Sequence, residues 1–504
     1  MSEAPVETEI KLLFEPGLRP RLEQHPAFAH AVRAAPRREL STYFDTDGLV
    51  LHRHGYSLRI REAGGELVQT LKKAPSDGAV HERNEWEWKL SQRRLALRPL
   101  DRAIAADAEL NGGLRGATSK FVTEIQRRRF DIRLDSSRVE AAIDEGVVRV
   151  GDREEPVCEV ELEIKDGPPG PAYRLALDLI EHNPFRIGVE SKAERGYRLL
   201  TGIVPPPVAA RAAPVQRRAA LGEALNWTAG AALHPFVANM SAARMGDPEA
   251  VHQMRVALRR LRTMLVLYAP FLDPEASERF SNSIRDTGAV LGAARDWDVF
   301  VGQTLSHARD AGVRAEWTAA LEEGATAKQE DARRGVRALI DGKAPGELVL
   351  GIEAWLCDPE AAAKRPKSAR VPIADIIPDL LDRLAEKVAR RGRRVTHSSP
   401  PELHRLRKSI KKMRYSVESA SALYPGKAVN RYVKRCKKLQ TALGTINDSQ
   451  VTIRLVEEIA PSHSAAWAPA AGAMLKWNAE RLKDAERDLA RAWRKLRHSD
   501  RVWR

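Results

Sequence analysis

Cysteine is scarce in this chain of 504 residues. The three cysteines, Cys158, Cys357 and Cys436, are an odd number at wide spacing. Such spacing supplies neither a disulfide framework nor the paired ligands of a structural zinc site. No basic segment followed by an apolar core opens the sequence, so no secretory leader is expected. We therefore expect a protein of a reducing compartment, the cytoplasm.

Long apolar runs and a phosphate-binding loop are also missing. One long stretch without charge, residues 224–243, contains Asn226, His234, Pro235 and Asn239, which argue against a membrane span. No glycine-rich loop ends in Lys-Ser or Lys-Thr, which excludes a P-loop nucleotide hydrolase. Neither a membrane nor a P-loop nucleotide site is expected.

Positive charge is concentrated in one part of the chain. Residues 1–200 carry 32 Lys and Arg against 34 Asp and Glu, whereas residues 201–504 carry 51 against 34. The C-terminal part should therefore attract polyanions. Its basic segments lack interleaved aromatic residues and show no recognised nucleic-acid motif, so no specific nucleic-acid partner is predicted.

The pattern along the chain predicts an α+β protein of two domains. The first part reads as strands with a few helical inserts, such as residues 172–181, and the last part reads almost entirely as helix. A Pro/Ala-rich linker separates them. The predicted division is residues 1–202, a linker at 203–215, and a helical domain at 216–504.

Several predicted strands carry charge alone on one face. Glu7, Glu9 and Lys11 alternate with apolar residues and would share a face of a strand. Neighbouring carboxylates need a cation between them, and a lysine beside them suits an anion bridging to that cation, so this face predicts a metal and phosphate site. The same alternation recurs at Arg59 and Arg61, at Lys72, in residues 83–89, at Arg127 and Arg129, and at Glu159, Glu161 and Glu163. Charged faces of both signs predict a closed sheet whose lumen holds a charged ligand.

These motifs, together with Ser191-Lys192-Ala193-Glu194-Arg195-Gly196, resemble the CYTH domain of the triphosphate tunnel metalloenzymes over about residues 5–202. The resemblance implies an eight-stranded antiparallel tunnel with flanking helices that hydrolyses a triphosphate with Mg²⁺ or Mn²⁺. It implies a catalytic set of Glu7, Glu9, Lys11, Arg59, Arg61 and Lys72. The implied metal ligands are Glu7, Glu9, Asp144, Glu159, Glu161 and Glu163. The implied triphosphate ligands are Lys11, Arg59, Arg61, Lys72, Arg83, Arg127, Arg129, Lys192 and Arg195. Which of the three glutamates in residues 159–163 bind metal stays open, and alternation favours Arg127 and Arg129 as the inward arginines.

The helical part contains an internal repeat. Residues 251–262 match residues 403–414, and Leu291-Gly292 with Asp296 matches Leu443-Gly444 with Asp448, both at an offset of 152. Two blocks in one register predict a duplicated helical bundle with pseudo-two-fold symmetry and repeats at about 216–370 and 371–504.

Each copy of the repeat carries a basic helix face. His252, Arg255, Arg259 and Arg262 fall on one face of the first copy, and His404, Arg407, Lys411 and Arg414 are their counterparts. A row of cations is either an ordinary solvated face or half of a polyanion site. Its recurrence in both copies favours the second interpretation. Neither histidine has further ligands at metal-binding spacing.

These blocks resemble the CHAD domain over about residues 215–504. The resemblance implies a helical domain that binds inorganic polyphosphate in a basic groove. The implied polyphosphate ligands are His252, Arg255, Arg259, Arg260, Arg262, His404, Arg407, Lys408, Lys411, Lys412 and Arg414.

The sequence thus predicts a cytoplasmic, metal-dependent hydrolase of inorganic triphosphate with a C-terminal polyphosphate-binding domain, which could associate with polyphosphate granules. Two alternatives stay open. A hydrolase of organic triphosphates would show base-stacking aromatic residues at the tunnel mouth. A non-catalytic polyphosphate-granule protein would lack a metal-binding glutamate.

Overall fold

The computed structural model describes the whole chain except residues 1–5, 74–81, 105–109, 111–112, 364–370 and 460–466. The chain forms two compact units. The first comprises Met1–Pro207 and Ile340–Pro359, and the second comprises Val208–Leu339 and Glu360–Arg504. Segment 340–359, which the sequence division placed in the helical domain, thus packs within the first unit.

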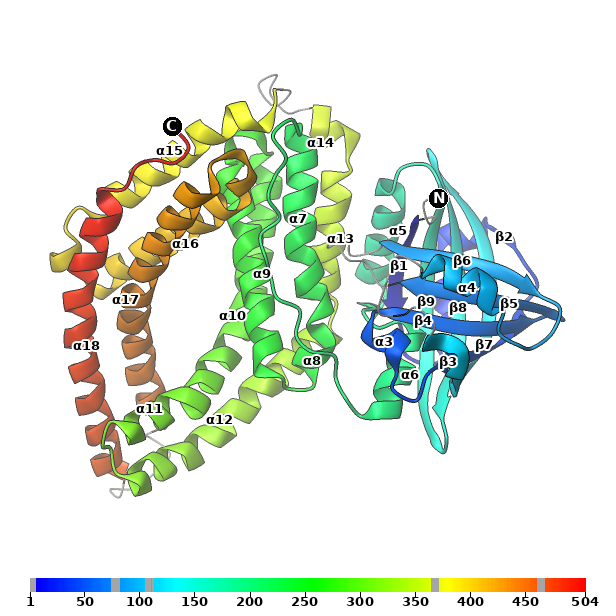
Figure 1. Cartoon of the computed structure of the whole chain (residues 1–504), viewed down its shortest axis with the longest axis horizontal. Helices are drawn as coiled ribbons and strands as arrows, with labels where there is room; N and C mark the ends of the chain where they lie inside the picture. Colours follow the sequence, from blue (N-terminus) through cyan, green and yellow to red (C-terminus); the bar gives the residue numbers. More distant parts are fainter. Residues whose placement is uncertain (1–5, 74–81, 105–109, 111–112, 364–370, 460–466) are drawn as a thin grey trace. The chain divides into compact units, whose positions relative to one another are not determined.

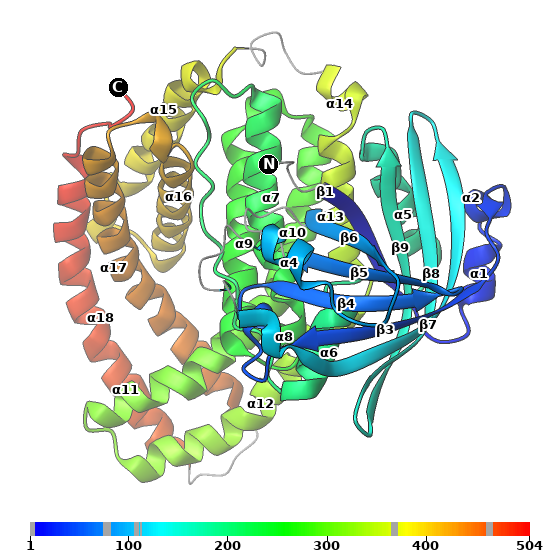
Figure 2. The same ribbon diagram turned by 45° about the vertical axis from the view of Figure 1, so that its right-hand side comes forward.

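The first unit is built on one antiparallel sheet (Figures 1 and 2). Its strands are β1 (Val6–Leu13), β2 (Val32–Arg33), β3 (Arg37–Asp45), β4 (Tyr56–Ala63), β5 (Glu66–Lys73), β6 (Glu82–Leu90), β7 (Thr118–Leu134), β8 (Ser137–Val150), β9 (Arg153–Asp166) and β10 (Arg186–Ile187). Eight of them follow the order β1-β6-β5-β4-β3-β7-β8-β9, and β9 pairs in turn with β1.

The prediction of an eight-stranded closed tunnel needs two corrections. The sheet has ten strands, because the two-residue strands β2 and β10 add to β7 and β1. Its hydrogen bonding is also not continuous around the circumference. Among the described residues, β1 pairs with β6 through Val6–Thr8 and with β9 through Glu9–Leu13, so different parts of β1 face the two neighbours.

Apolar residues on the outer face of the sheet pack under short helices. These helices are α1 (Arg19–Glu23), α2 (Pro26–Ala29), α3 (Val50–Arg53), α4 (Leu97–Ala103), α5 (Gly170–His182), α6 (Lys192–Thr201) and α13 (Ala344–Leu356). Tyr56 and Leu58 of β4 are buried with Leu51 of α3 and Leu100 of α4. The intervening Arg59 and Arg61 are left for the inner face, which confirms the predicted alternation.

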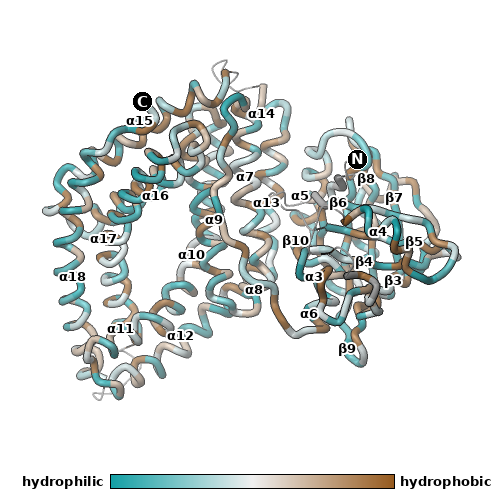
Figure 3. Tube along the Cα trace, viewed as in Figure 1, coloured by the Kyte–Doolittle hydropathy of each residue, from teal (hydrophilic) through white to brown (hydrophobic). Residues whose placement is uncertain are grey.

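The second unit is helical (Figure 1). It contains α7 (Leu221–Ala238), α8 (Met240–Arg244), α9 (Pro248–Leu267), α10 (Pro274–Val299), α11 (Leu305–Asp310), α12 (Ala315–Asp341), α14 (Pro359–Ala363), α15 (Ile373–Gly392), α16 (Pro400–Ser419), α17 (Gly426–Ile459) and α18 (Ala468–Arg497). Hydrophilic and hydrophobic residues alternate along these helices (Figure 3). Among the residues that the structure describes, no helix is long and apolar enough to cross a membrane.

Local sequence sets where the two repeated helices begin. The side chain of Asp247 caps α9 by accepting hydrogen bonds from the backbone of Glu249 and Ala250. A Ser399–Glu402 capping box opens α16. Both helices bury the apolar stripes that the sequence predicted, Met254, Leu258, Leu261 and Leu265 in one copy and Leu406, Ile410, Met413 and Val417 in the other.

Candidate functional site

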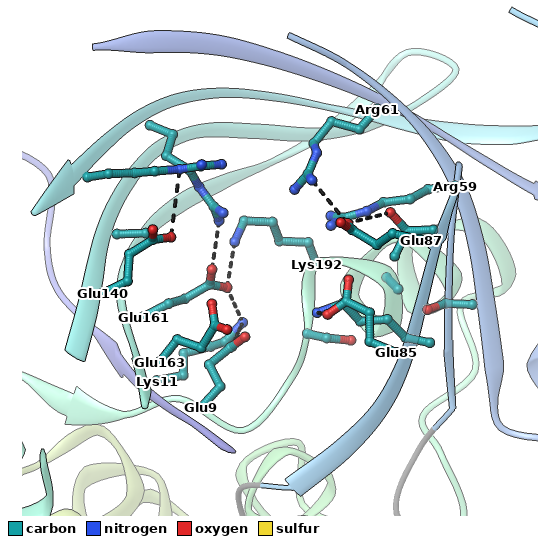
Figure 4. A pocket seen from close by; sticks show the side chains of 18 of the residues that line it. Glu9, Lys11, Arg59, Arg61, Glu85, Glu87, Glu140, Glu161, Glu163 and Lys192 are labelled. Carbon is teal, nitrogen blue, oxygen red and sulfur yellow. Dashed lines mark hydrogen bonds and ion pairs between the residues drawn. The ribbon is translucent and has the colours of Figure 1, made fainter. Parts of the chain in front are cut away.

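The sheet of the first unit surrounds a cavity of about 630 Å³ (Figure 4). Its lining is dominated by ionisable side chains of both signs. Among the described residues, eight basic side chains line it: Lys11, Arg59, Arg61, Lys72, Arg127, Arg129, Lys165 and Lys192. Six acidic residues line it: Glu9, Glu85, Glu87, Glu140, Glu161 and Glu163. The predicted charged interior is therefore present.

Strand register arranges part of this lining in rows. Glu9 of β1 lies opposite Glu163 of β9, which lies opposite Glu140 of β8. One step along, Lys11 lies opposite Glu161. Side chains directly opposite each other on antiparallel strands are about 5 Å apart at Cβ, so the first row sets three carboxylates side by side. A row of like charges is destabilising unless cations lie among its members, and here Lys11, Lys165 and Arg129 lie beside Glu9, Glu163 and Glu140 respectively.

A deeper layer of charge lies next to the cavity wall. Asp144 and Glu159 are fully buried. The Lys192 ammonium lies 2.7 Å from Asp144, 2.5 Å from Glu159 and 2.9 Å from Glu161. The Lys11 ammonium lies 3.1 Å from Glu159 and 2.9 Å from Glu161. Buried carboxylates are stable as anions only with such partners.

Arg127 completes this layer. Its guanidinium forms a bidentate salt bridge with Asp144, with hydrogen bonds of 2.7 and 2.5 Å, and also donates a hydrogen bond of 2.6 Å to Glu161. Burial alone would raise the pKa of Glu161, but Lys11, Lys192 and Arg127 outweigh it and hold that pKa well below its usual value. Glu161 is therefore an anion at neutral pH.

The opposite wall, from β4, β5 and β6, places cations beside carboxylates that are more exposed. Lys72 lies 2.8 Å from Glu85, and Arg61 donates to Glu87 at 3.1 Å. The Arg59 Nε is buried and has no hydrogen-bond partner among the described residues. The charge of Arg59, followed by burial, lowers the pKa of Arg61, because the two guanidiniums repel each other. An anion between them would relieve that repulsion.

Helix α6 positions Lys192. A capping box between Ser191 and Glu194 starts the helix and sets Lys192 in its first turn. The helix lies close to β7, because a Cβ at Gly196 would stand 2.1 Å from the Phe121 ring. Only glycine permits this approach.

One trio in this layer has the spacing of a metal site. Oxygen atoms of Asp144, Glu159 and Glu161 lie within 4.8 Å of one another. Carboxylate oxygens are the ligands that Mg²⁺ and Mn²⁺ prefer, so the donor set fits these ions. The lysine ammoniums and Arg127 contact the same oxygens, so metal binding here would require these cations to move.

Most of the site residues predicted from sequence are gathered here. Glu9, Lys11, Arg59, Arg61, Lys72, Arg127, Arg129, Glu161, Glu163 and Lys192 line the cavity, and Asp144 and Glu159 lie behind its wall. Arg195 is buried and donates to Glu159 at 2.9 Å. The side chains of Glu7 and Arg83 lie outside the described residues.

Tyr43, Glu85, Glu87 and Glu140 line the cavity but were not named as site residues from the sequence. Glu85 and Glu87 belong to the charged strand face that the sequence analysis identified in residues 83–89, whereas Tyr43 and Glu140 were not singled out. The strand that contains Tyr43 has charged residues only near its ends and carries Ser, Thr and Tyr between them, so neither face shows charge alone.

The second unit brings the two repeated basic faces together, since α9 packs against α16. Their contacts repeat at the offset of 152. Arg255 lies 3.8 Å from Asp296, and Arg407 lies 4.0 Å from Asp448. Gly292 and Gly444 lie beneath these two guanidiniums. These matched contacts agree with the predicted duplication.

Arg255, Arg259, Arg407 and Lys411 form what we call the central cluster. Burial, followed by Arg407, Arg259 and Arg255, lowers the pKa of Lys411 to about 6. Burial, followed by Arg295, lowers the pKa of His252 to about 4. The Nε atoms of Arg259 and Arg407 are buried without hydrogen-bond partners among the described residues. Half-buried cations that repel one another favour a bound anion.

Comparisons with known proteins agree with both halves of the chain. The CYTH domain family model matches residues 6–197, and the CHAD domain family model matches residues 228–457. An inorganic triphosphatase of Haemophilus influenzae is 28% identical over 208 residues, which are 38% of this chain and 54% of that protein. An uncharacterised protein of Mycobacterium tuberculosis is 26% identical over 220 residues, 42% of this chain and 40% of that protein. The chain thus spans about half the length of these curated relatives.

One solved structure resembles the helical unit. The CHAD domain of Ricinus communis aligns with a TM-score of 0.51 and 28% identity, and covers 59% of this chain and 99% of that one.

Proposed function

This chain is a CYTH domain followed by a CHAD domain, and on that premise we propose that its first unit hydrolyses inorganic triphosphate to pyrophosphate and phosphate with Mg²⁺ or Mn²⁺. The observation that carries this proposal is a single cavity of about 630 Å³ lined by eight basic and six acidic side chains. A small polyanion that carries divalent cations balances both signs of charge, whereas a neutral ligand leaves like charges facing one another.

The basic residues would hold the phosphates. Arginine suits this role because its planar fork matches two phosphate oxygens at once. Arg59 lines the cavity, and its Nε has no hydrogen-bond partner among the described residues, so the hydrogen-bonding capacity of this guanidinium is not fully used within the protein. Arg195 would act through Glu159 from behind the wall. The proposed phosphate-binding set is Lys11, Arg59, Arg61, Lys72, Arg83, Arg127, Arg129 and Lys192.

The carboxylates would hold the metal. Glu9, Glu161 and Glu163 offer oxygen ligands at the wall, Asp144 and Glu159 offer them one layer deeper, and Glu7 is a further proposed ligand. A bound divalent ion would neutralise phosphate charge and lower the pKa of a coordinated water. Lys11 and Lys192 have flexible stems, so their ammoniums can turn from the carboxylates to phosphate oxygens.

The cavity disfavours the alternative of organic triphosphates. Tyr43 is the one aromatic residue among its described lining residues. Its ring stacks on Phe121 with 4.6 Å between centroids, so one face is already covered. A base would find little stacking surface. A non-catalytic role is also disfavoured, because Glu9 and Glu161 are both present at the wall.

The test is phosphate release from inorganic triphosphate, ATP, thiamine triphosphate and long polyphosphate, each with Mg²⁺ and with Mn²⁺. We expect metal-dependent release that is fastest from inorganic triphosphate. A folded protein that releases phosphate from none of them with either metal would overturn the enzymatic proposal. Faster release from ATP or thiamine triphosphate would favour the organic alternative.

For the second unit we propose binding of inorganic polyphosphate through the central cluster, in the cytoplasm and at polyphosphate granules. Support comes from the close packing of four half-buried basic side chains, because burial and then neighbouring arginines lower the pKa values of Arg407 and Lys411. A salt-series titration with long polyphosphate, RNA and heparin tests this. We expect affinity to fall steeply with salt and to favour polyphosphate. Charge reversal at Arg255 with Arg259, or at Arg407 with Lys411, should abolish binding. Equal affinity for all three polymers, unaffected by both reversals, would reduce the cluster to a non-specific basic surface.

A further inference from the structure

The two copies of the repeated helix carry basic residues at matching positions, but the groups around those residues differ. Beyond the central cluster, Arg260 and Arg414 form one flank, and their counterparts at the offset of 152 are Lys412 and Arg262. If both copies had kept the same surroundings, a polyanion would find two equivalent exits from the central cluster. The structure shows that the surroundings differ.

The flank of Arg260 and Arg414 is partly neutralised, because both guanidiniums share the single carboxylate of Glu418. Arg260 lies 3.1 Å from Glu418, and Arg414 also lies 3.1 Å from Glu418. Both guanidiniums lie over the ring of Tyr415, 4.6 and 4.5 Å from its centroid. Arg260 further donates to the backbone of Ala210 at 3.0 Å. These contacts use the charge of this flank within the protein.

The opposite flank lacks these neutralising groups. The counterparts of Glu418 and Tyr415 are Val266 and Thr263. Within the described part of the chain, no carboxylate lies within ion-pair distance of Arg262, Lys408 or Lys412. The same two positions of the repeat are therefore paired in one copy and exposed to a ligand in the other.

Helix α15 adds further cations on the exposed flank. Arg391 donates to the backbone carbonyl of Arg405 at 3.0 Å and to the Ser409 hydroxyl at 2.6 Å, which fixes the end of α15 against α16. Lys387 lies one helical turn earlier on the same face. Burial, followed by Arg262, Lys387 and Arg391, lowers the pKa of Lys412 to about 8, which places these groups near one another.

We propose that a linear polyphosphate bound at the central cluster leaves it on one side only, along a basic track of Arg262, Lys387, Arg391, Lys408 and Lys412. This inference rests on the proposed polyphosphate binding of the second unit and adds Lys387 and Arg391, from outside the repeated helix, to that site. A chain that reaches the track gains contacts that a shorter chain lacks, so the track makes affinity depend on length.

The test compares matched variants of the full chain in titrations with polyphosphate of graded length. Arg262→Gln and Arg414→Gln remove the same charge at equivalent positions of the two copies. Val266→Glu places in the exposed flank the carboxylate that Glu418 supplies to the other. We expect Arg262→Gln and Val266→Glu to weaken long-chain binding by roughly three- to tenfold each, the cost of about one or two phosphate contacts. Arg414→Gln should change it by less than about twofold, because Arg414 is already paired with Glu418 and, unlike what the CHAD resemblance implied, is not part of the proposed polyphosphate site.

Two results distinguish this inference from the proposal on which it rests. Loss of binding in Arg255→Gln with Arg259→Gln, but equal effects of Arg262→Gln and Arg414→Gln, would keep polyphosphate binding and overturn the one-sided track. Unchanged binding in the central double variant would overturn both. Thermal unfolding of each variant shows that it is folded, and Val266→Glu gives an independent answer, since it removes no existing ion pair.

Discussion

Glu159 and Glu9 show how two glutamates of one site can do different work. Glu159 is fully buried and contacts Lys11 at 3.1 Å, Lys192 at 2.5 Å and Arg195 at 2.9 Å. Glu9 lines the cavity, and its nearest cation among these is Lys11 at 3.6 Å. We infer that Glu159, besides its proposed part in metal binding, balances buried cations that the fold depends on, whereas Glu9 acts mainly on the ligand.

Substitution should separate the two roles. Glu159→Gln leaves three buried cations short of one counter-charge and should lower the free energy of unfolding by about 3 kcal/mol. Glu9→Gln removes one of the carboxylates facing Glu163 and should leave stability level or higher. The turnover of inorganic triphosphate by the Glu9→Gln variant should fall by at least about a hundredfold. Urea unfolding and phosphate release measure both, and equal stability losses would contradict the assignment.

Lys411 should make polyphosphate binding depend on pH. Burial and Arg407, Arg259 and Arg255 lower its pKa to about 6 in the folded protein, against about 10.4 in an unfolded chain. Between these pH values the unfolded chain binds a proton that the folded chain lacks. This residue therefore makes stability rise with pH from about 6 to about 10. A bound polyanion restores the charge, so binding near pH 8 should take up a proton.

Calorimetry in two buffers of different ionisation enthalpy measures that proton. We expect the wild-type chain to show uptake that Lys411→Arg largely loses, because arginine stays charged at this pH. Identical uptake in the two proteins would assign the proton to another group.

Alternation of charge was sufficient to predict that Arg59, Arg61 and Glu161 face the interior of the sheet, because a strand of period two sends such residues to one face. The alternation could not show how deeply each inward-facing side chain is buried. Whether Glu159 lies at the wall or behind it depends on the pairing of β9 with β1, two strands almost 150 residues apart in sequence. Tyr43 escaped prediction because its strand offers no charge-only face.

At the scale of elements, α6 depends on a close approach that its sequence barely signals. A Cβ at Gly196 would lie 2.1 Å from Phe121, which itself stacks on Tyr43 at the cavity wall. Gly196→Val should therefore displace the helix that carries Lys192. We expect a loss of about 2–3 kcal/mol in stability and a clear fall in turnover.

Gly472→Ala is the matched control for Gly196→Val. Gly472 lies within α18, and a Cβ there meets no atom within 4 Å. Alanine should stabilise that helix by up to about 1 kcal/mol. Equal effects of the two substitutions on unfolding would show that α6 tolerates the added side chain.

Repeats were the most predictable elements. The repeat at the offset of 152 predicted the core stripes of both copies, and the structure adds matched Arg–Asp contacts that the sequence analysis did not predict, because duplicated sequence keeps duplicated packing. The strand count was less predictable, since β2 and β10 are two residues long and carry no periodic signal. Short strands form only because a neighbouring strand edge is available to pair with them.

At the scale of the whole molecule, compact units do not follow sequence order. Helix α13 lies in sequence between α12 and α14 of the helical unit, yet it packs against α5 in the first unit. Leu348, Val349, Leu350 and Ile352 of α13 are buried. The proline-rich linker marks the first place where the chain passes from one unit to the other. The sequence around α13 carries no comparable signal for the two later crossings.

This arrangement predicts how the first unit behaves alone. A fragment of residues 1–207 keeps the sheet and the cavity residues but exposes the face of α5 that α13 covers, including Ile180. The fragment should fold and hydrolyse triphosphate, with a Tm roughly 5–10 °C below that of the same fragment saturated with a peptide of residues 340–359, because a ligand that binds only the folded state raises Tm. A Gly346→Val peptide should fail to restore the Tm, since a Cβ at Gly346 would lie 2.7 Å from the Ile180 side chain. Equal Tm values with no peptide, with the native peptide and with the variant peptide would show that α13 adds nothing to the stability of the unit in which it lies.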